Sequence, residues 1–123
     1  MDYFSKANVM YNSKDYEKAI AFYERALDED SSNSASCYYN SSVCHIKLKK
    51  YPDAIYLLKK AIRLKDESKY YFNLAYCYAL LGNNKDALYF FNKAWCLNEN
   101  DEDCEKAINL ILKKEIDKTK KSY

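Results

Sequence analysis

Apolar residues recur at helical spacing in three segments of this chain. In YEKAIAFYERAL (16–27) they lie one, three and four residues apart, with charged side chains between them. The same pattern returns in YPDAIYLLKKAI (51–62) and NKDALYFFNKAW (84–95). Such an apolar stripe is typical of a helix that packs one face on a neighbour. The sequence therefore predicts the same amphipathic helix three times.

A second helical stretch precedes each of these segments. The three stretches are DYFSKANVMYN (2–12), SCYYNSSVCHIKL (36–48) and KYYFNLAYCYALL (69–81). Short polar turns separate each stretch from the helix that follows it. Pro52 suits the first turn of its helix, where a missing N–H costs nothing, and Gly82 suits the end of the preceding helix. Each unit is thus expected to be a helix hairpin.

Three columns of small residues recur in register, at spacings of 35 and 33 residues. Two columns lie seven positions apart on the second helix of each hairpin, and the third lies on the first helix. The columns are Ala19, Ala54 and Ala87; Ala26, Ala61 and Ala94; and Ala7, Ser42 and Ala75. Small side chains on one face allow a neighbouring helix to approach closely, and a bulky side chain there should cost about 1 to 3 kcal/mol by overpacking. We expect the two helices of each hairpin to touch at these positions.

Residues 102–118 predict one further helix. Its apolar stripe, opposite charged residues, consists of Cys104, Ala107, Ile108, Ile111 and Leu112. A stacked array of hairpins leaves its last unit with an exposed apolar face, which a terminal helix covers. One glycine and one proline leave little material for strand hairpins or phosphate loops. The expected fold is all-α, an α-solenoid of three helix-turn-helix repeats with a capping helix, about seven helices in all.

Length and charge narrow the possible partners. A chain of 123 residues with 49% hydrophobic and 31% charged residues fits one globular domain. A formal net charge of +2 is too small to indicate nucleic acid or an anionic membrane, which require a concentrated basic face. The longest apolar run, LAYCYALL (74–81), is too short for a membrane span, and no signal-peptide pattern opens the chain. We expect a cytoplasmic protein with no nucleic-acid and no membrane partner.

The nucleophilic and metal-binding residue types form no catalytic or ligand pattern. Five cysteines are an odd number and include no CxxC pair, so the sequence indicates neither a disulfide framework nor a zinc knuckle. His45, the only histidine, cannot pair with Cys44 within a helix, because adjacent side chains point about 100° apart. We therefore expect reduced thiols, a core or half-buried imidazole, no metal, no cofactor and no enzymatic activity.

The period of paired helices resembles that of the tetratricopeptide-repeat (TPR) family. The resemblance rests on the aligned alanines, on the aromatic residues Tyr16 and Tyr51, and on Tyr38–Asn40, and it covers about residues 2–101. It implies a single domain over the whole chain. The implied parts are repeats at about 1–33, 35–67 and 68–101, a capping helix at about 102–118 and a basic tail at 119–123.

In TPR proteins the first helices of successive hairpins line a concave groove, so the resemblance implies a binding face on those helices. Its aromatic side chains would offer apolar contacts, and its asparagine amides would pair with the main chain of a peptide. The expected occupant is a peptide segment of a partner protein. The expected peptide-binding residues are Phe4, Asn8, Tyr11, Asn12, Tyr39, Asn40, Val43, Lys47, Lys69, Phe72, Asn73 and Tyr76.

Two other interpretations are open. The same side chains would also serve packing or self-association, which makes the chain a scaffold that binds a second copy of itself. Alternatively, the chain resembles relatives that hold acidic C-terminal peptides of heat-shock chaperones in a carboxylate clamp of two lysines, two asparagines and an arginine. Asn8, Asn40 and Lys69 match that clamp. Phe4 and Asn73 replace two of its three cations, which removes most of the charge-assisted hydrogen bonding.

Overall fold

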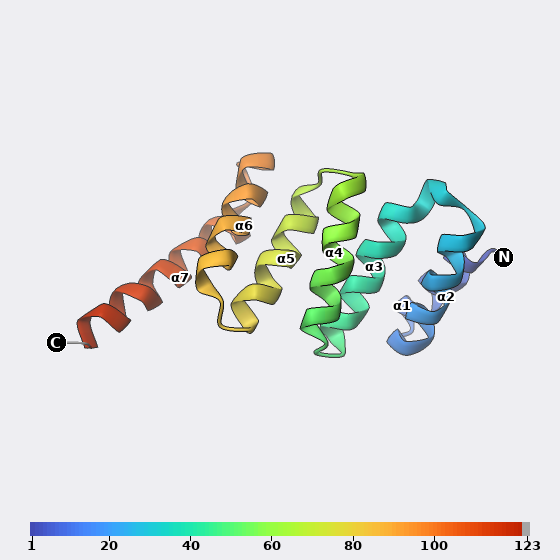
Figure 1. Cartoon of the computed structure of the whole chain (residues 1–123), viewed down its shortest axis with the longest axis horizontal. Coiled ribbons are helices and arrows are strands. Elements are labelled where there is room, and N and C mark those ends of the chain that lie inside the picture. The colour runs from blue at the N-terminus through green and yellow to red at the C-terminus, as the bar shows by residue number, and fades with distance from the viewer. Residues whose placement is uncertain (122–123) are drawn as a thin grey trace. The chain divides into compact units, whose positions relative to one another are not determined.

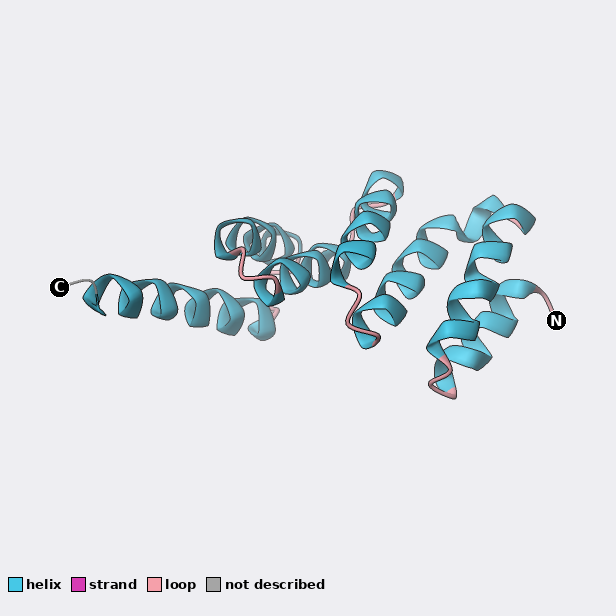
Figure 2. Cartoon of the chain, turned by 60° about the horizontal axis from the view of Figure 1, so that its bottom comes forward, coloured by secondary structure: helices cyan, strands magenta, loops and turns pink. Residues whose placement is uncertain are grey.

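The computed structural model describes residues 1–121, which form helices joined by short connections (Figures 1 and 2). The helices are α1 (Tyr3–Asn12), α2 (Tyr16–Glu29), α3 (Ser34–Lys47), α4 (Tyr51–Leu64), α5 (Ser68–Leu80), α6 (Asn84–Leu97) and α7 (Glu102–Lys121). A short 3-10 turn over Ser31–Asn33 precedes α3. The described residues contain no strand, so the expected all-α fold of about seven helices is confirmed.

The chain divides into two compact units. Unit 1 comprises residues 1–66 and unit 2 begins at Glu67. In unit 1, α1 pairs with α2 and α3 pairs with α4, and the packing of α2 on α3 joins the two hairpins. In unit 2, α5 pairs with α6, and α7 packs on α6. The helix pairs are therefore the predicted hairpins.

The columns of small residues lie inside the hairpins. Ala7 and Ala19 belong to one buried cluster of unit 1, and Ala75 and Ala87 belong to one buried cluster of unit 2. All four side chains are 0% exposed. Helices pack about 8 to 10 Å apart depending on the side chains between them, and alanine permits the close end of that range. The predicted contact between the helices of a hairpin is confirmed.

Each hairpin turn repeats one backbone conformation. Lys14, Lys49 and Gly82 follow the first helix of their hairpins and have φ of 65°, 61° and 80°. In each turn this residue donates its N–H to a carbonyl three residues back, and the next residue donates five residues back. This is the Schellman arrangement, which ends a helix with one residue in the left-handed region. Two of the three hairpins place a lysine where glycine carries no steric cost.

Side-chain caps begin four of the seven helices. The side chain of Asp2 accepts from the Ser5 N–H, that of Asp15 from Lys18, and that of Asn83 from Asp86. Asp101 Oδ1 accepts from the N–H groups of Asp103 and Cys104 at the start of α7. Each cap satisfies backbone donors that have no partner within the helix and contributes about 1 kcal/mol. Three acidic residues that precede helices, Asp2, Asp15 and Asp101, thus serve as caps.

Helix α7 covers α6 with a narrower stripe than its sequence suggests. Cys104 and Ile111 are buried, but Leu112 is 45% exposed. The prediction that Leu112 belongs to the buried stripe is wrong, because the packing of α7, mainly on α6, leaves that flank uncovered. Residues 119–121 of the expected basic tail belong to α7, and residues 122–123 lie outside the described residues. No helix within residues 1–121 is both long and apolar enough to cross a membrane.

The left-handed turns predict a reciprocal pair of stability changes. Replacing Lys49 by glycine should raise the free energy of unfolding by about 0.5–1 kcal/mol, because the relief of left-handed strain exceeds the added flexibility of the unfolded chain. Gly82→Ala should lower it by about 1 kcal/mol. An added Cβ at Gly82 meets no atom within 4 Å, so only the backbone conformation opposes it. Urea unfolding followed by circular dichroism measures both changes, and a shift of the same sign in both variants would contradict the assignment.

Candidate functional site

A polar triad of Asn8, Tyr23 and Asn40, from three helices, lies at the predicted binding face of unit 1. The Tyr23 hydroxyl of α2 donates to Asn8 Oδ1 of α1 at 2.5 Å. The side-chain amide of Asn40 on α3 lies beside the same phenol and acts to lower its pKa, against the larger effect of burial. Tyr23 itself is 1% exposed, and burial raises the pKa of its phenol far above the usual range. The phenol therefore stays protonated and holds two of the predicted asparagines in place.

The triad leaves the whole NH2 group of one amide and the whole oxygen of the other amide available. Asn8 uses its carbonyl oxygen, so its Nδ2 group is left to donate. The effect of Asn40 on the phenol, a lowered pKa, is that of an N–H group facing the phenol oxygen, so its Oδ1 is left to accept. Neither group has another hydrogen-bond partner among the described residues. A donor and an acceptor from neighbouring helices match the C=O and N–H groups of a peptide main chain.

Aromatic rings of the predicted face rest edge-on against rings of the second helices. In unit 1, Phe4 meets Tyr23 with ring centroids 6.1 Å apart at 61°. In unit 2, Phe72 meets Phe91 at 5.3 Å and 68°. Such pairs contribute about 0.5–1.5 kcal/mol beyond burial and fix the ring orientation. Both phenylalanines are partly exposed, so each presents an ordered apolar edge to solvent.

The other predicted residues of unit 1 surround the triad. Tyr11 packs edge-on against Tyr16, with ring centroids 6.0 Å apart. Tyr39 and Val43 are partly buried on α3. Asn12 and Lys47 are exposed at the ends of α1 and α3. Unit 1 thus carries eight of the twelve predicted residues: Phe4, Asn8, Tyr11, Asn12, Tyr39, Asn40, Val43 and Lys47.

The predicted residues of unit 2 lie on α5, and two of them have neighbours within the same unit. Asn73 Nδ2 donates to the Lys69 carbonyl at 2.8 Å, one turn earlier on the same helix. Lys69 Nζ lies 3.7 Å from Glu67 Oε2. Tyr76 is 42% exposed. Lys69, the one cation retained from the clamp pattern, is therefore partly neutralised by an acidic neighbour.

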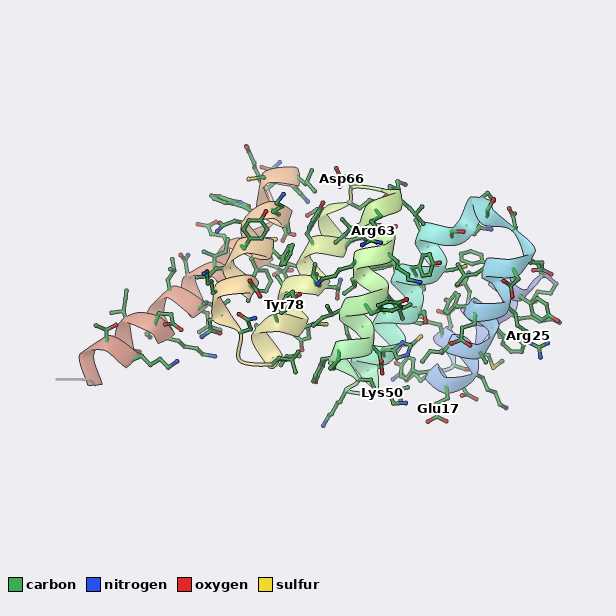
Figure 3. The ribbon with its side chains drawn as sticks, viewed as in Figure 1. Glu17, Arg25, Lys50, Arg63, Asp66 and Tyr78 are labelled. Atoms are coloured by element: carbon green, nitrogen blue, oxygen red, sulfur yellow. The ribbon has the colours of Figure 1, made fainter. Side chains whose placement is uncertain are left out.

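Other aromatic side chains tie the first helix of a hairpin to the second. Arg25 of α2, labelled in Figure 3, donates to the Tyr3 hydroxyl at 3.2 Å and stands 5.4 Å from that ring. Tyr78 of α5, also labelled in Figure 3, stacks on Phe90 of α6 at 5.7 Å. Part of the high tyrosine content of the chain therefore serves the packing of the two helices within a hairpin.

Sequence reasoning missed the role of Tyr23. Its position in the apolar stripe of 16–27 predicted only packing, and the ring is indeed buried. One signal was present: the equivalent positions of the other two hairpins are Leu58 and Phe91, which have no hydroxyl. A tyrosine on a stripe that is otherwise apolar requires a hydrogen-bond partner, and the asparagines on the facing helices supply it.

The thiols are free, and four of the five are buried. Cys37, Cys44, Cys77 and Cys104 are buried, and Cys96 is exposed. Burial raises the pKa of Cys37 to about 11 and that of Cys44, Cys77 and Cys104 to about 12. Within residues 1–119, no group of three or more histidine, cysteine or acidic side chains is placed to hold a metal ion. The buried thiols behave as small apolar side chains.

Comparison with known families gives two matches. The family model for tetratricopeptide repeats matches residues 45–95. The family model for subunit 3 of the anaphase-promoting complex, the cyclosome, matches residues 1–61. The heat shock protein STI1 of Saccharomyces cerevisiae is 33% identical over 54 residues, which are 44% of this chain and 9% of that protein. The chain thus spans less than a tenth of the length of this relative.

Solved structures of TPR proteins have the same fold. YrrB, a TPR protein with an unusual peptide-binding site, is 30% identical and has a TM-score of 0.81 over 92% of this chain and 58% of its own. The first TPR of Spaghetti (RPAP3), solved bound to an HSP90 peptide, is 20% identical and has a TM-score of 0.86. That match covers 93% of this chain and 90% of the RPAP3 chain. At such low identity the second likeness concerns the fold alone.

Removing the Tyr23 hydroxyl should weaken the folded state. Tyr23→Phe keeps the ring packing but deletes the donor to Asn8, and we expect a loss of about 1 kcal/mol in the free energy of unfolding. Tyr89→Phe is the matched control, since Tyr89 is 55% exposed, and it should change stability by less than about 0.5 kcal/mol. Chemical denaturation of the three proteins measures both effects. Equal stability of Tyr23→Phe and the wild type would contradict the structural role of the triad.

The buried thiols predict slow labelling and a loss of stability at alkaline pH. In the native protein a thiol reagent should label Cys96 alone, whereas the unfolded chain should expose all five cysteines. The folded pKa values of about 11 and 12 exceed the ordinary 9.0, so the folded state binds more protons between these values. The contribution of the protonated thiols to the free energy of unfolding is therefore complete below about pH 9 and is lost as pH rises toward 11–12. Mass spectrometry after labelling and unfolding curves across this range test the prediction, which rapid native labelling of Cys44 would overturn.

Proposed function

Because the chain belongs to the tetratricopeptide-repeat family and is a protein-interaction module, we propose that it binds an extended peptide segment of a partner protein on its first-helix faces. The observation that carries the proposal is the triad of Asn8, Tyr23 and Asn40. It orients an amide donor and an amide acceptor from α1 and α3 before any ligand arrives. Side chains already held in place lose less conformational entropy on binding, so more of each contact contributes to affinity.

Aromatic side chains set the chemistry of the preferred peptide. Phe4 and Tyr39 flank the triad in unit 1, and Phe72 with Tyr76 forms a second partly exposed aromatic set in unit 2. We infer that each set receives apolar or aromatic side chains, while the amides pair with the peptide main chain. The likeness to YrrB, a TPR protein with an unusual peptide-binding site, supports peptide binding in general at 30% identity.

A clamp for acidic C-terminal peptides is the second candidate. It is favoured by the similarity of 54 residues to the heat shock protein STI1. Two observations weigh against it. Tyr23 already engages Asn8 and Asn40, and Glu67 lies 3.7 Å from the ammonium of Lys69. A clamp draws its affinity from charge-assisted hydrogen bonds, which are about twice as strong as neutral ones.

Salt should weaken peptide binding by a clamp but leave binding of apolar peptides almost unchanged. A peptide array probed at two salt concentrations therefore decides between the two candidates. The array carries apolar and aromatic internal peptides beside acidic C-terminal peptides, and is probed at low and high salt. We expect salt-resistant binding of the apolar peptides. Asn40→Ala should weaken it about 5- to 30-fold, since one well-placed hydrogen bond contributes about 1 to 2 kcal/mol. Salt-sensitive binding of acidic peptides would instead establish the clamp.

Asn109→Ala is the matched control for the array, because Asn109 is an exposed asparagine of α7, outside the predicted face. It should bind like the wild type. If Asn40→Ala binds apolar peptides as well as Asn109→Ala does, the triad has no part in recognition. If no peptide of either class is retained, the first-helix faces are not the binding surface.

A further inference from the structure

Unit 1 contains a cavity on the side of α3 that the proposed peptide site does not use. The cavity measures about 200 Å³, and α3 lies between the two helices that complete it, α2 and α4 (Figure 1). Its polar and aromatic lining consists of Glu24, Tyr38, Ser41, His45, Asp53, Tyr56 and the ring of Tyr23, and the Cys37 thiol also borders it. Leucines of α2 and α4 complete the lining. We call this cavity the α3 trench.

The α3 trench and the predicted peptide site lie on opposite faces of one helix. Successive residues of a helix turn by about 100°, so Tyr38, Ser41 and His45 fall within one sector of about 60°. Tyr39, Asn40 and Val43 fall in a sector centred roughly 180° away. A ligand of the α3 trench would therefore contact none of the amides of the triad.

Three hydrogen-bond acceptors from three helices converge on the α3 trench. Glu24 of α2 and Asp53 of α4 supply carboxylates, and neither makes an ion pair among the described residues. His45 Nδ1 lies 2.7 Å from the Ser41 carbonyl, which can only accept, so the proton resides on Nδ1. With a single ring proton on Nδ1, the Nε2 atom is an acceptor. The lining thus favours a ligand that carries several N–H donors and a positive charge.

Two tyrosine rings of the α3 trench already hold a cation of the chain itself. Lys60 Nζ stands 4.6 Å from the ring centroid of Tyr56 and 5.5 Å from that of Tyr38. A cation within about 6 Å of an aromatic face is attracted by the ring quadrupole. Lys60 lies one turn after Tyr56 on α4 and is not part of the lining. The lining therefore bears two negative charges, those of Glu24 and Asp53, and the cation of Lys60 lies outside it.

The size of the cavity limits what it accepts. Sites for whole small-molecule ligands usually enclose about 300–1,000 Å³. A cavity of about 200 Å³ is smaller than that range and suits one long side chain. A planar guanidinium with five donors satisfies acceptors spread over three helices and stacks on a tyrosine ring, which an ammonium does less well.

We propose that the α3 trench binds the side chain of an arginine on a partner protein. The guanidinium hydrogen-bonds the carboxylates of Glu24 and Asp53 and the Nε2 atom of His45, and its plane stacks against Tyr56. It competes with Lys60 for the tyrosine faces. The α3 trench is thus a second recognition site of unit 1, and its ligand contacts a different face of α3 from the peptide main chain that the triad recognises.

The test is a titration of the ¹⁵N-labelled full chain with N-acetyl-arginine amide, followed by amide chemical shifts. We expect saturable shifts at α3 trench residues, with a dissociation constant in the millimolar range because the probe is small. The citrulline amide, its neutral analogue, and the lysine amide should each bind at least about 5-fold more weakly. Shifts that do not saturate, or equal binding of either analogue, would overturn the proposal.

Three variants locate the effect. The double variant Glu24→Gln/Asp53→Asn should weaken arginine amide by at least about 5-fold. Glu17→Gln, the matched control, removes a charge from the same helix α2 at an exposed position outside the α3 trench, and should change affinity by less than about 2-fold (Figure 3). Lys60→Met should tighten binding about 2- to 5-fold, because it removes the competing cation. If neither the double variant nor Lys60→Met changes the affinity for arginine amide, the proposal is overturned. This holds even if the peptide array detects binding to the first-helix faces.

Discussion

The close approach of the two helices within each hairpin is the constraint on which the rest of the structure depends. Alanines at the crossing point are 0% exposed on both helices of the first and third hairpins. With so little side-chain volume between the backbones, the longer side chains on either side of the crossing point meet across the hairpin. Phe4 thereby reaches Tyr23, and Phe72 reaches Phe91, in edge-on contacts of the same kind. The ordered aromatic edges of the proposed site are thus a consequence of small residues elsewhere.

The three hairpins share one packing pattern but differ in the chemistry of single side chains. The column of Tyr23, Leu58 and Phe91 is buried throughout, so packing alone accepts an aromatic or an aliphatic side chain. Only the tyrosine carries a hydroxyl, and only there do two facing asparagines meet a buried donor and acceptor. In unit 2, Asn73 bonds the backbone of its own helix instead. Chemically similar columns of asparagine therefore acquire different local roles from one residue on the neighbouring helix.

The sequence predicted the helices well because period and caps are local signals. Hairpin boundaries followed from polar turns, and Pro52 lies in the first turn of α4 as expected. It failed for Leu112, whose exposure depends on which helices surround α7. A lysine shows no sign of a left-handed backbone, so Lys14 and Lys49 became apparent only when aligned with Gly82 in the structure. The α3 trench was missed for a similar reason. Its acceptors come from three helices, and no spacing within one helix brings Glu24, His45 and Asp53 together.

Tyr23 connects the two surfaces of unit 1. Its ring lines the α3 trench, and its hydroxyl holds the amides of Asn8 and Asn40 on the other side. The phenol is a rigid group at 1% exposure in a close-packed core, so the ring and the hydroxyl move together. Any ligand of the α3 trench that displaces the ring also changes the separation of the two amides. By thermodynamic linkage such an effect is reciprocal, because a peptide that fixes the amides would favour the same position of the ring. Among the three hairpins, the first alone has this hydroxyl. It is therefore the hairpin in which binding at one face would change the affinity of the other face.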